Sequence, residues 1–456
     1  KKRVRLNGNK TGIMKPCRGT TARKTSKKEN IIMNPFLEKA ADAEEYLEPV
    51  QKLYPKAYDK NEVDPYTKTR IILACGAEFE ANWFSHQLQR TTEDNDFRRQ
   101  LAFLRFLEKE QQQKIANLKP IDETFLETTI SYEQLAVDLT AELAQKEKNF
   151  SVKKALDFAL LEDFDHLYRY SDLLENDEGI HAETLVGNYT EIMPARPTVS
   201  HHRHPYDNVK KPVDSTKDDT QTVLCTMIIT AAEQQTMNYY MNGSATYRND
   251  AGRKLYEEIA LVEEEHVTQY GSLIDASADP LACLLWHEFT ECYLYWSNYN
   301  TETDKRIRKL WEFYFETELS HLHAVRKIVK KKLKKDYDEI IKDPVFPEPL
   351  SLHENIAYVR DVLSSTVQFT GDLEDYKNVS DVGEKDRYFA YRGKFCAPVS
   401  GMPSHKVIKD YIAARGKDYR FETDVHPIGA LKSRTTDNVK VGFDPSEAKS
   451  TRFKAN

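Results

Sequence analysis

Acidic residues at a fixed spacing of 30 positions are the feature that most constrains the fold of this chain. They lie in long segments whose apolar residues recur at every third or fourth position, the period of an amphipathic α-helix. Two antiparallel helices joined by a short loop return to the same level after about this many residues, because a helix rises about 1.5 Å per residue. The pairs are Glu78 with Glu108, Glu133 with Asp163, Glu233 with Glu263, and Glu288 with Glu318. The spacing predicts four helical hairpins, each with two acidic residues at one height.

The helical pattern falls into two blocks. The first covers residues 67–175, and the second contains four helices near 220–242, 250–275, 279–298 and 304–335. Glycines and prolines interrupt the pattern between the blocks, and the prolines of "DPVFPEP" end the last helix. Beyond them we expect only short helices, near 353–365 and 404–415. Two blocks of four helices indicate an internal repeat.

A shift of 155 residues aligns the acidic positions of the two blocks without a gap. A solvated charged face would not keep such a register across four helices. The shift places Glu78 on Glu233, Glu108 on Glu263, Gln111 on His266, Glu133 on Glu288, Asp163 on Glu318, and His166 on His321.

Several of these positions form an acid-x-x-His motif. The motif alone is weak, because chance supplies about two matches in a chain of this composition. The chain has four, of which Glu178 and His181 lie in the Gly/Pro-rich connection and are interpreted as noise. In a helix, residues three apart share a face, so the carboxylate and the imidazole point the same way. Buried carboxylates are costly unless they are neutralised, which divalent cations achieve. The alternative is a set of surface ion pairs.

The di-metal carboxylate pattern consists of one acid from each of two helices and an acid-x-x-His motif from each of the other two. On these residues, positions 67–335 resemble the ferritin-like superfamily, which includes rubrerythrins, bacterioferritins and manganese catalases. The resemblance implies a centre of two Fe ions, two Mn ions or a mixed pair in the second block. Its ligands would be Glu233, Glu263, His266, Glu288, Glu318 and His321.

The first block fits the pattern in part. Gln111 stands where the pattern has His, and Asp163 where it has Glu, so metal binding in this block is left open. The corresponding residues are Glu78, Glu108, Gln111, Glu133, Asp163 and His166. Glu291, one turn after Glu288, is an extra ligand in the rubrerythrin manner or a neighbouring residue that binds no metal.

Two further groups near the expected centre have more than one interpretation. Tyr239, Tyr240, Tyr293 and Tyr314 are core aromatics or, alternatively, redox-active or gating residues. The sequence "HHRHP" contains His201, His202 and His204. It is interpreted as a loop cap over a bundle or as exposed histidines, with a second metal site as the alternative.

Composition narrows the class of protein. The net charge of −7 argues against nucleic-acid binding. Six scattered cysteines without a Cys-x-x-Cys pair give no support for a rubredoxin or zinc-ribbon site, and favour a reducing, cytoplasmic location. No apolar run approaches the roughly 18 residues of a membrane span. Residues 1–29 are strongly basic and read as a flexible arm, which is either a solvated disordered tail or a segment that clasps an acidic partner or a sister subunit.

Together these features predict an all-α protein of two tandem ferritin-like four-helix bundles, with a basic N-terminal arm and an irregular C-terminal extension. The expected segments are the arm 1–35, a first bundle 36–175 with a degenerate site, a connection 176–219, a second bundle 220–342 with an intact site, and an extension 343–456. The implied function is oxidoreduction of O2, peroxide or Fe(II), with a separate electron donor. The alternative is an iron-storage or structural assembly protein. Either would form a homo-oligomer or larger assembly through the arm and the extension.

Overall fold

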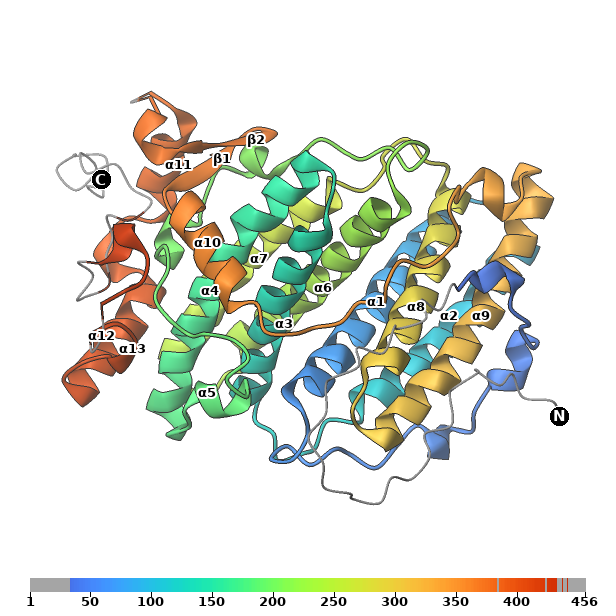
Figure 1. Cartoon of the computed structure of the whole chain (residues 1–456), viewed down its shortest axis with the longest axis horizontal. Coiled ribbons are helices and arrows are strands. Elements are labelled where there is room, and N and C mark those ends of the chain that lie inside the picture. Colours follow the sequence, from blue (N-terminus) through green and yellow to red (C-terminus); the bar gives the residue numbers. More distant parts are fainter. Residues whose placement is uncertain (1–32, 384, 423–424, 433–436, 438–440, 442–456) are drawn as a thin grey trace, which may run out of the picture.

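The computed structural model describes residues 33–441 apart from 384, 423–424, 433–436 and 438–440. Most of these residues are helical (Figure 1), which confirms the all-α class. In the described part of the chain, one antiparallel strand pair, β1 (Phe369–Asp372) and β2 (Asp375–Asn378), completes the structure. Residues 1–32 of the expected basic arm lie outside the described residues.

The four expected hairpins are present, each with a short loop. Their bounds are α1 Pro65–Arg90 and α2 Asn95–Ala116, α3 Phe125–Lys146 and α4 Phe150–Glu178, α6 Thr220–Thr246 and α7 Asp250–Gly271, and α8 Pro280–Thr301 and α9 Lys305–Leu333. The second helix of every hairpin starts at an Asp or Asn whose side chain accepts hydrogen bonds from backbone N–H groups of the first turn. These N-cap residues are Asp94, Asn149, Asn249 and Asp304.

The hairpins associate across the two halves of the chain. Helices α3, α4, α6 and α7 form one group, and helices α1, α2, α8 and α9 form the other (Figure 1). In the first group α3 contacts α6 and α4 contacts α7, while in the second α1 contacts α8 and α2 contacts α9. The structure therefore does not confirm two bundles in tandem, because each group takes one hairpin from each half.

Helices α1 and α6 bring the two groups together. A Cβ atom at Gly76 of α1 would lie only 2.8 Å from the carbonyl oxygen of Ala231 in α6, so glycine permits this close approach. Gly76 and Ala231 are also equivalent under the shift of 155 residues. The two halves of the chain thus meet at matching positions, with a small residue on each side.

The segments outside the hairpins cover the two groups. They include α5 (Ala182–Leu185), α10 (Ile356–Thr366), α11 (Arg387–Phe395), α12 (Pro403–Arg415) and α13 (Tyr419–Glu422). Helices α10 and α12 pack against α4, and α12 also packs against α7. At the N-terminal side, short 3-10 turns at Pro35–Leu37 and Ala43–Tyr46 pack against α9. A bilayer-crossing helix is not found among the described residues.

Candidate metal centres

Six ligand-type side chains converge among α3, α4, α6 and α7, and we name them cluster A. They are Glu133, Asp163, His166, Glu233, Glu263 and His266, none more than 1% exposed. Their ligand atoms form two groups, each within 4.8 Å: Asp163, Glu233, Glu263 and His266, and Glu133, His166 and Glu263. Glu263 belongs to both groups. Cluster A thus has the donors for metal binding at two adjacent positions with one shared carboxylate.

A second set, cluster B, lies among α1, α2, α8 and α9. Its members are Glu78, Glu108, Gln111, Glu288, Glu291, Glu318 and His321, all buried. Here too ligand atoms converge within 4.8 Å, in the groups Glu108, Glu288 and His321, and Glu288, Glu291 and Glu318. Both clusters are acidic groups that could hold a metal ion.

These groupings correct the expected assignment of ligands to halves of the chain. Glu233, Glu263 and His266 lie in cluster A, whereas Glu288, Glu318 and His321 lie in cluster B. The structure therefore does not bring these six residues together in one centre of a second bundle. Sequence register fixes the height of each residue on its hairpin, but it does not fix which other hairpin that residue faces. All twelve aligned positions nevertheless reach one cluster or the other.

Hydrogen bonds fix the orientation of His266 in cluster A. Its Nε2 lies 2.8 Å from Glu162 Oε2, while its Nδ1 lies 3.2 Å from Glu263 and 3.3 Å from Asp163. An Nε2–H donated to Glu162 leaves Nδ1 to face the cluster as a ligand atom. Although burial alone would raise it, Arg203, His266 and Arg196 hold the pKa of Glu162 well below its usual range, so Glu162 is a carboxylate acceptor. A histidine held by a carboxylate on its far side is a common support for metal ligands.

Two successive hydrogen bonds, from His166 to His201 and from His201 to the backbone, fix the orientation of His166. Its Nδ1 lies 3.0 Å from Glu263 Oε1, and its Nε2 lies 3.2 Å from Nδ1 of His201. Nε2 of His201 in turn lies 2.9 Å from the carbonyl oxygen of Arg196, which can only accept. His201 therefore donates to that carbonyl and accepts from His166, which turns Nδ1 of His166 to the cluster.

The segment "HHRHP" is thus a cap over cluster A. His201 and His202 are at most 1% exposed, so the interpretation as exposed histidines is wrong for these two. His202 lies 3.8 Å from both Glu258 and Glu265 and does not reach the cluster's ligand groups.

Cluster B has a different arrangement around its histidine. Leu107 occupies the position on α2 that Glu162 occupies on α4, 55 residues later. Within the described residues neither ring nitrogen of His321 has a hydrogen-bond partner, although its Nδ1 lies 3.4 Å from Glu318. Gln111, at the position of His166, donates from Nε2 to Glu78 Oε1 at 2.5 Å and to Glu318 Oε1 at 2.6 Å.

A tyrosine serves each cluster in the same way. Tyr240 donates to Glu133 at 2.6 Å, and Tyr295 donates to Glu78 at 2.6 Å. Of the other tyrosines considered from the sequence, Tyr239 donates to the carbonyl oxygen of Phe125 and Tyr293 to that of Glu348. The hydroxyl of Tyr314 is buried with no hydrogen-bond partner among the described residues.

Burial dominates the electrostatics of both clusters. It raises the pKa of Glu233 and of Glu108 to about 7. It also raises the pKa values of Glu78, Glu133, Asp163, Glu288 and Glu291 well above their usual range. Glu263 of cluster A differs from these groups, because His266 and His166 outweigh burial and lower its pKa to about 2. Packed carboxylates of this kind are favourable only with protons or cations between them.

Sequence reasoning missed Glu162, Arg196 and Arg203, which support the histidines, and it did not predict that His201 holds His166. Glu162 directly precedes Asp163, so "EDFDH" carries two acids before its histidine. Adjacent helix positions face different directions, which concealed its role. Glu178 and His181 take part in neither cluster, in agreement with their interpretation as noise.

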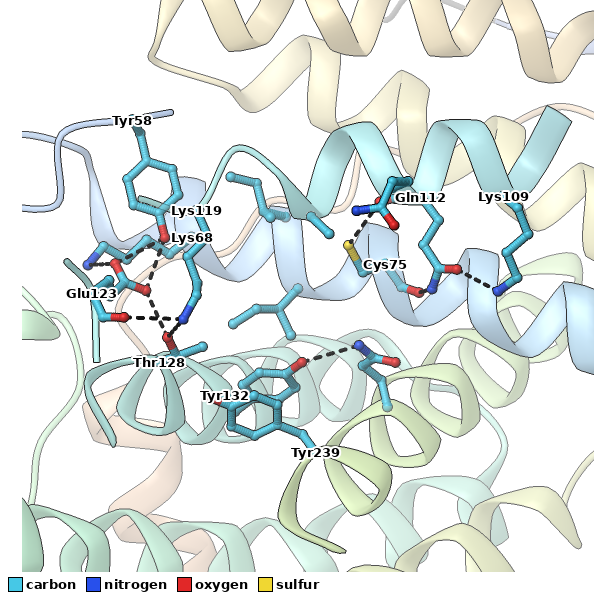
Figure 2. Close-up of a pocket in the computed structure, with 15 residues that line it drawn as sticks. Tyr58, Lys68, Cys75, Lys109, Gln112, Lys119, Glu123, Thr128, Tyr132 and Tyr239 are labelled. Carbon is cyan, nitrogen blue, oxygen red and sulfur yellow. Dashed lines mark hydrogen bonds and ion pairs between the residues drawn. The ribbon is translucent and has the colours of Figure 1, made fainter. Parts of the chain in front are cut away.

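A cavity of about 380 Å³ lies between α1, α2, α3 and α6 (Figure 2). Lys68, Lys119 and Glu123 lie at one end, and Cys75 and Lys109 at the other (Figure 2). None of its lining residues is a member of cluster A or cluster B. The cavity is therefore a separate feature of the hairpin interface.

Comparisons with known proteins give no relative. No family model matches the chain, and no curated protein or solved structure is detectably similar to it. The function has to be argued from the clusters themselves.

Proposed function

We propose that cluster A binds two metal ions, Fe, Mn or one of each, and that the protein is a ferritin-like, non-haem dinuclear oxidoreductase acting on O2, peroxide or Fe(II). The observation that carries this proposal is the pair of ligand groups that share Glu263. Each group includes one histidine whose Nδ1 faces the cluster, through Glu162 for His266 and through His201 for His166.

The donor set supports these metals. Two divalent ions would neutralise the four carboxylates of cluster A, whose close burial is otherwise costly. Carboxylate with imidazole ligation suits iron and manganese. Cluster A takes one acid from each of α3 and α6, and an acid-x-x-His motif from each of α4 and α7. This is the ligand arrangement of ferritin-like di-metal proteins.

The surroundings of cluster A indicate what the chain contributes to a reaction. Bound redox-active metal ions would supply electron exchange with an oxidant. Tyr240 holds the carboxylate of Glu133 through its hydroxyl, and the buried Arg203–Glu162 pair holds His266. Because every ligand is almost fully buried, the site favours a substrate as small as O2, peroxide or a metal ion. Without Cys-x-x-Cys motifs, electrons would come from a separate donor.

The first experiment is elemental analysis of the full chain beside the variant Glu263→Ala. Glu264→Ala is the matched control, since Glu264 is the exposed neighbour on the same helix. We expect the wild-type chain and the control to contain Fe or Mn that the Glu263→Ala variant lacks. The rate at which O2, peroxide or Fe(II) is consumed should fall together with the metal content. Metal content unaffected by Glu263→Ala would overturn the proposal. Iron uptake far beyond the ligand positions would instead indicate storage.

A further inference from the structure

Cluster A and cluster B correspond residue by residue under a shift of 55. Glu133, His166 and Glu263 form one ligand position of cluster A, which we call position 1, and their counterparts in cluster B are Glu78, Gln111 and Glu318. Asp163, Glu233, Glu263 and His266 form position 2, with counterparts Glu108, Glu288, Glu318 and His321. The two positions can therefore be judged separately in cluster B.

Position 2 of cluster B keeps every ligand type of its counterpart. The ligand atoms of Glu108, Glu288 and His321 lie within 4.8 Å of one another, as their counterparts do in cluster A. All three residues are at most 3% exposed. Among the described residues, one carboxylate oxygen of each glutamate and both nitrogens of His321 have no hydrogen-bond partner. Buried polar atoms without partners are costly, and a cation would satisfy them together.

Glu291 adds to this position. It stands where cluster A has Thr236, and its ligand atoms converge with those of Glu288 and Glu318. Both of its carboxylate oxygens are buried without a hydrogen-bond partner in the described part of the chain. Position 2 of cluster B therefore has a carboxylate within reach that cluster A lacks.

Position 1 of cluster B is already occupied by protein hydrogen bonds. Nε2 of Gln111 donates one hydrogen to Glu78 and the other to Glu318, so both amide hydrogens are used. Glu78 also accepts from Tyr295. An amide NH2 between two carboxyl groups gives each of them a hydrogen bond at the place that a bridging cation would take. It also places donor hydrogens where a metal ion needs lone pairs.

From this correspondence we propose that cluster B binds a single divalent cation at Glu108, Glu288 and His321, with Glu291 and Glu318 in reach, and that the Gln111 amide takes the place of a second ion. The site does not depend on the function proposed for cluster A. A set of oxygen donors with one imidazole suits Mn²⁺ or Fe²⁺. The chain would then bind three ions when both clusters are full.

The test uses the full chain with cluster A disabled by Glu263→Ala and His266→Ala. After anaerobic incubation with Mn²⁺ and removal of excess metal, we expect one Mn per chain by elemental analysis. Its electron paramagnetic resonance signal should be that of an isolated ion. Adding His321→Gln should remove the ion. Adding Gln111→His should raise the content to two Mn per chain with a spin-coupled signal, because it restores position 1.

Gln113→His is the matched control, since it adds a histidine at an exposed position of the same helix. It should leave the Mn content at one. Two Mn with native Gln111, none at all, or no gain from Gln111→His would each overturn the proposal. If the background variant does not fold by circular dichroism, the wild-type chain is compared with His321→Gln, and a difference other than one ion overturns it. Failure of cluster A to bind metal would leave this result unchanged.

Discussion

Cluster A and cluster B are built on the same helical frame, yet their surroundings differ. In cluster A, Glu162 and His201 hold both histidines with Nδ1 toward the carboxylates. In cluster B, Leu107 replaces Glu162, Gln111 replaces the second histidine, and His321 has no hydrogen-bond partner among the described residues. The difference is the basis for our proposal that one set of acidic positions serves two metal stoichiometries. It predicts that the lost ligand and the support around the remaining ligands set the number of ions.

The largest expected effect comes from Glu263 of cluster A, compared with Glu318, its counterpart in cluster B under the shift of 55. Glu263→Ala should remove two metal ions and abolish the metal-dependent activity, because Glu263 belongs to both ligand groups of cluster A. The matched change Glu318→Ala should remove at most one ion and leave that activity in place. Elemental analysis with an O2 or peroxide assay measures both. Equal losses of metal and of activity from the two variants would contradict the proposed difference between the clusters.

The next largest effect is expected from changing Glu162, whose carboxylate holds His266. Glu162→Gln should weaken metal binding at cluster A by about 10–100-fold, the usual range for removing an outer partner of a metal ligand. Leu107→Met, at the equivalent place in cluster B, should change metal affinity little. Competition with a chelator measures both affinities. A Glu162→Gln protein that binds metal as tightly as wild type would show that the Glu162 carboxylate is not needed to orient His266.

Both clusters should make the stability of the metal-free protein decrease as the pH rises. Glu233 and Glu108 have pKa values of about 7 in the folded protein, above the ordinary 4.5, because burial raises them. Their contribution to stability is complete below about pH 4.5 and is lost as the pH rises through 7. The metal-free protein should therefore unfold at lower urea concentrations at pH 8 than at pH 5.

Added metal should reverse this loss. Free Mn²⁺ at 100 times its dissociation constant stabilises a folded protein by about 2.7 kcal/mol per site. Because Glu233 and Glu108 each belong to one ligand position of their cluster, Glu233→Gln and Glu108→Gln should each reduce the Mn²⁺-dependent stabilisation at pH 8 by about one site. Urea denaturation with and without EDTA tests this. Metal-free stability that rises from pH 5 to pH 8 would contradict the assignment of raised carboxyl pKa values.

The two tyrosines give the smallest effect. Tyr240→Phe and Tyr295→Phe each remove one hydrogen bond to a buried carboxylate, at Glu133 and Glu78 respectively. Such bonds contribute about 0.5–1.5 kcal/mol with a neutral acceptor and about 1.5–3 kcal/mol with a charged one. Burial raises the pKa of both carboxyls well above the usual range, which favours the lower figure in the metal-free protein. Tyr240→Phe should weaken metal binding at cluster A, whereas Tyr295→Phe should lower the stability of the metal-free protein without changing the metal count. A loss of metal from Tyr295→Phe would mean that position 1 of cluster B is filled by a cation after all.

Much of the site could be predicted from the sequence, because helical period and register are local properties. The spacing of 30 identified Glu133 with Asp163 and Glu233 with Glu263, and these four carboxylates do meet in cluster A. The grouping could not be predicted, since a hairpin presents the same residues whichever hairpin it packs against. The supporting residues could not be predicted either. His201 acts from an irregular segment whose path depends on tertiary contacts.

The fold shows the same division between local and tertiary information. Helix bounds follow from apolar period and from N-cap residues such as Asn149 and Asp304. The exchange of hairpins between the halves depends on contacts such as that of Gly76 with Ala231, which no local pattern reveals. Each half of the chain gives one hairpin to each cluster, as expected if a duplicated unit associates with its copy.

Anomalous X-ray diffraction from crystals of the Mn-loaded chain, at the manganese absorption edge, tests the central claim most directly. Two peaks in cluster A are predicted, one among Asp163, Glu233, Glu263 and His266, and the other among Glu133, His166 and Glu263. A cluster A with no peak, or with one peak under saturating Mn²⁺, would contradict a dinuclear centre.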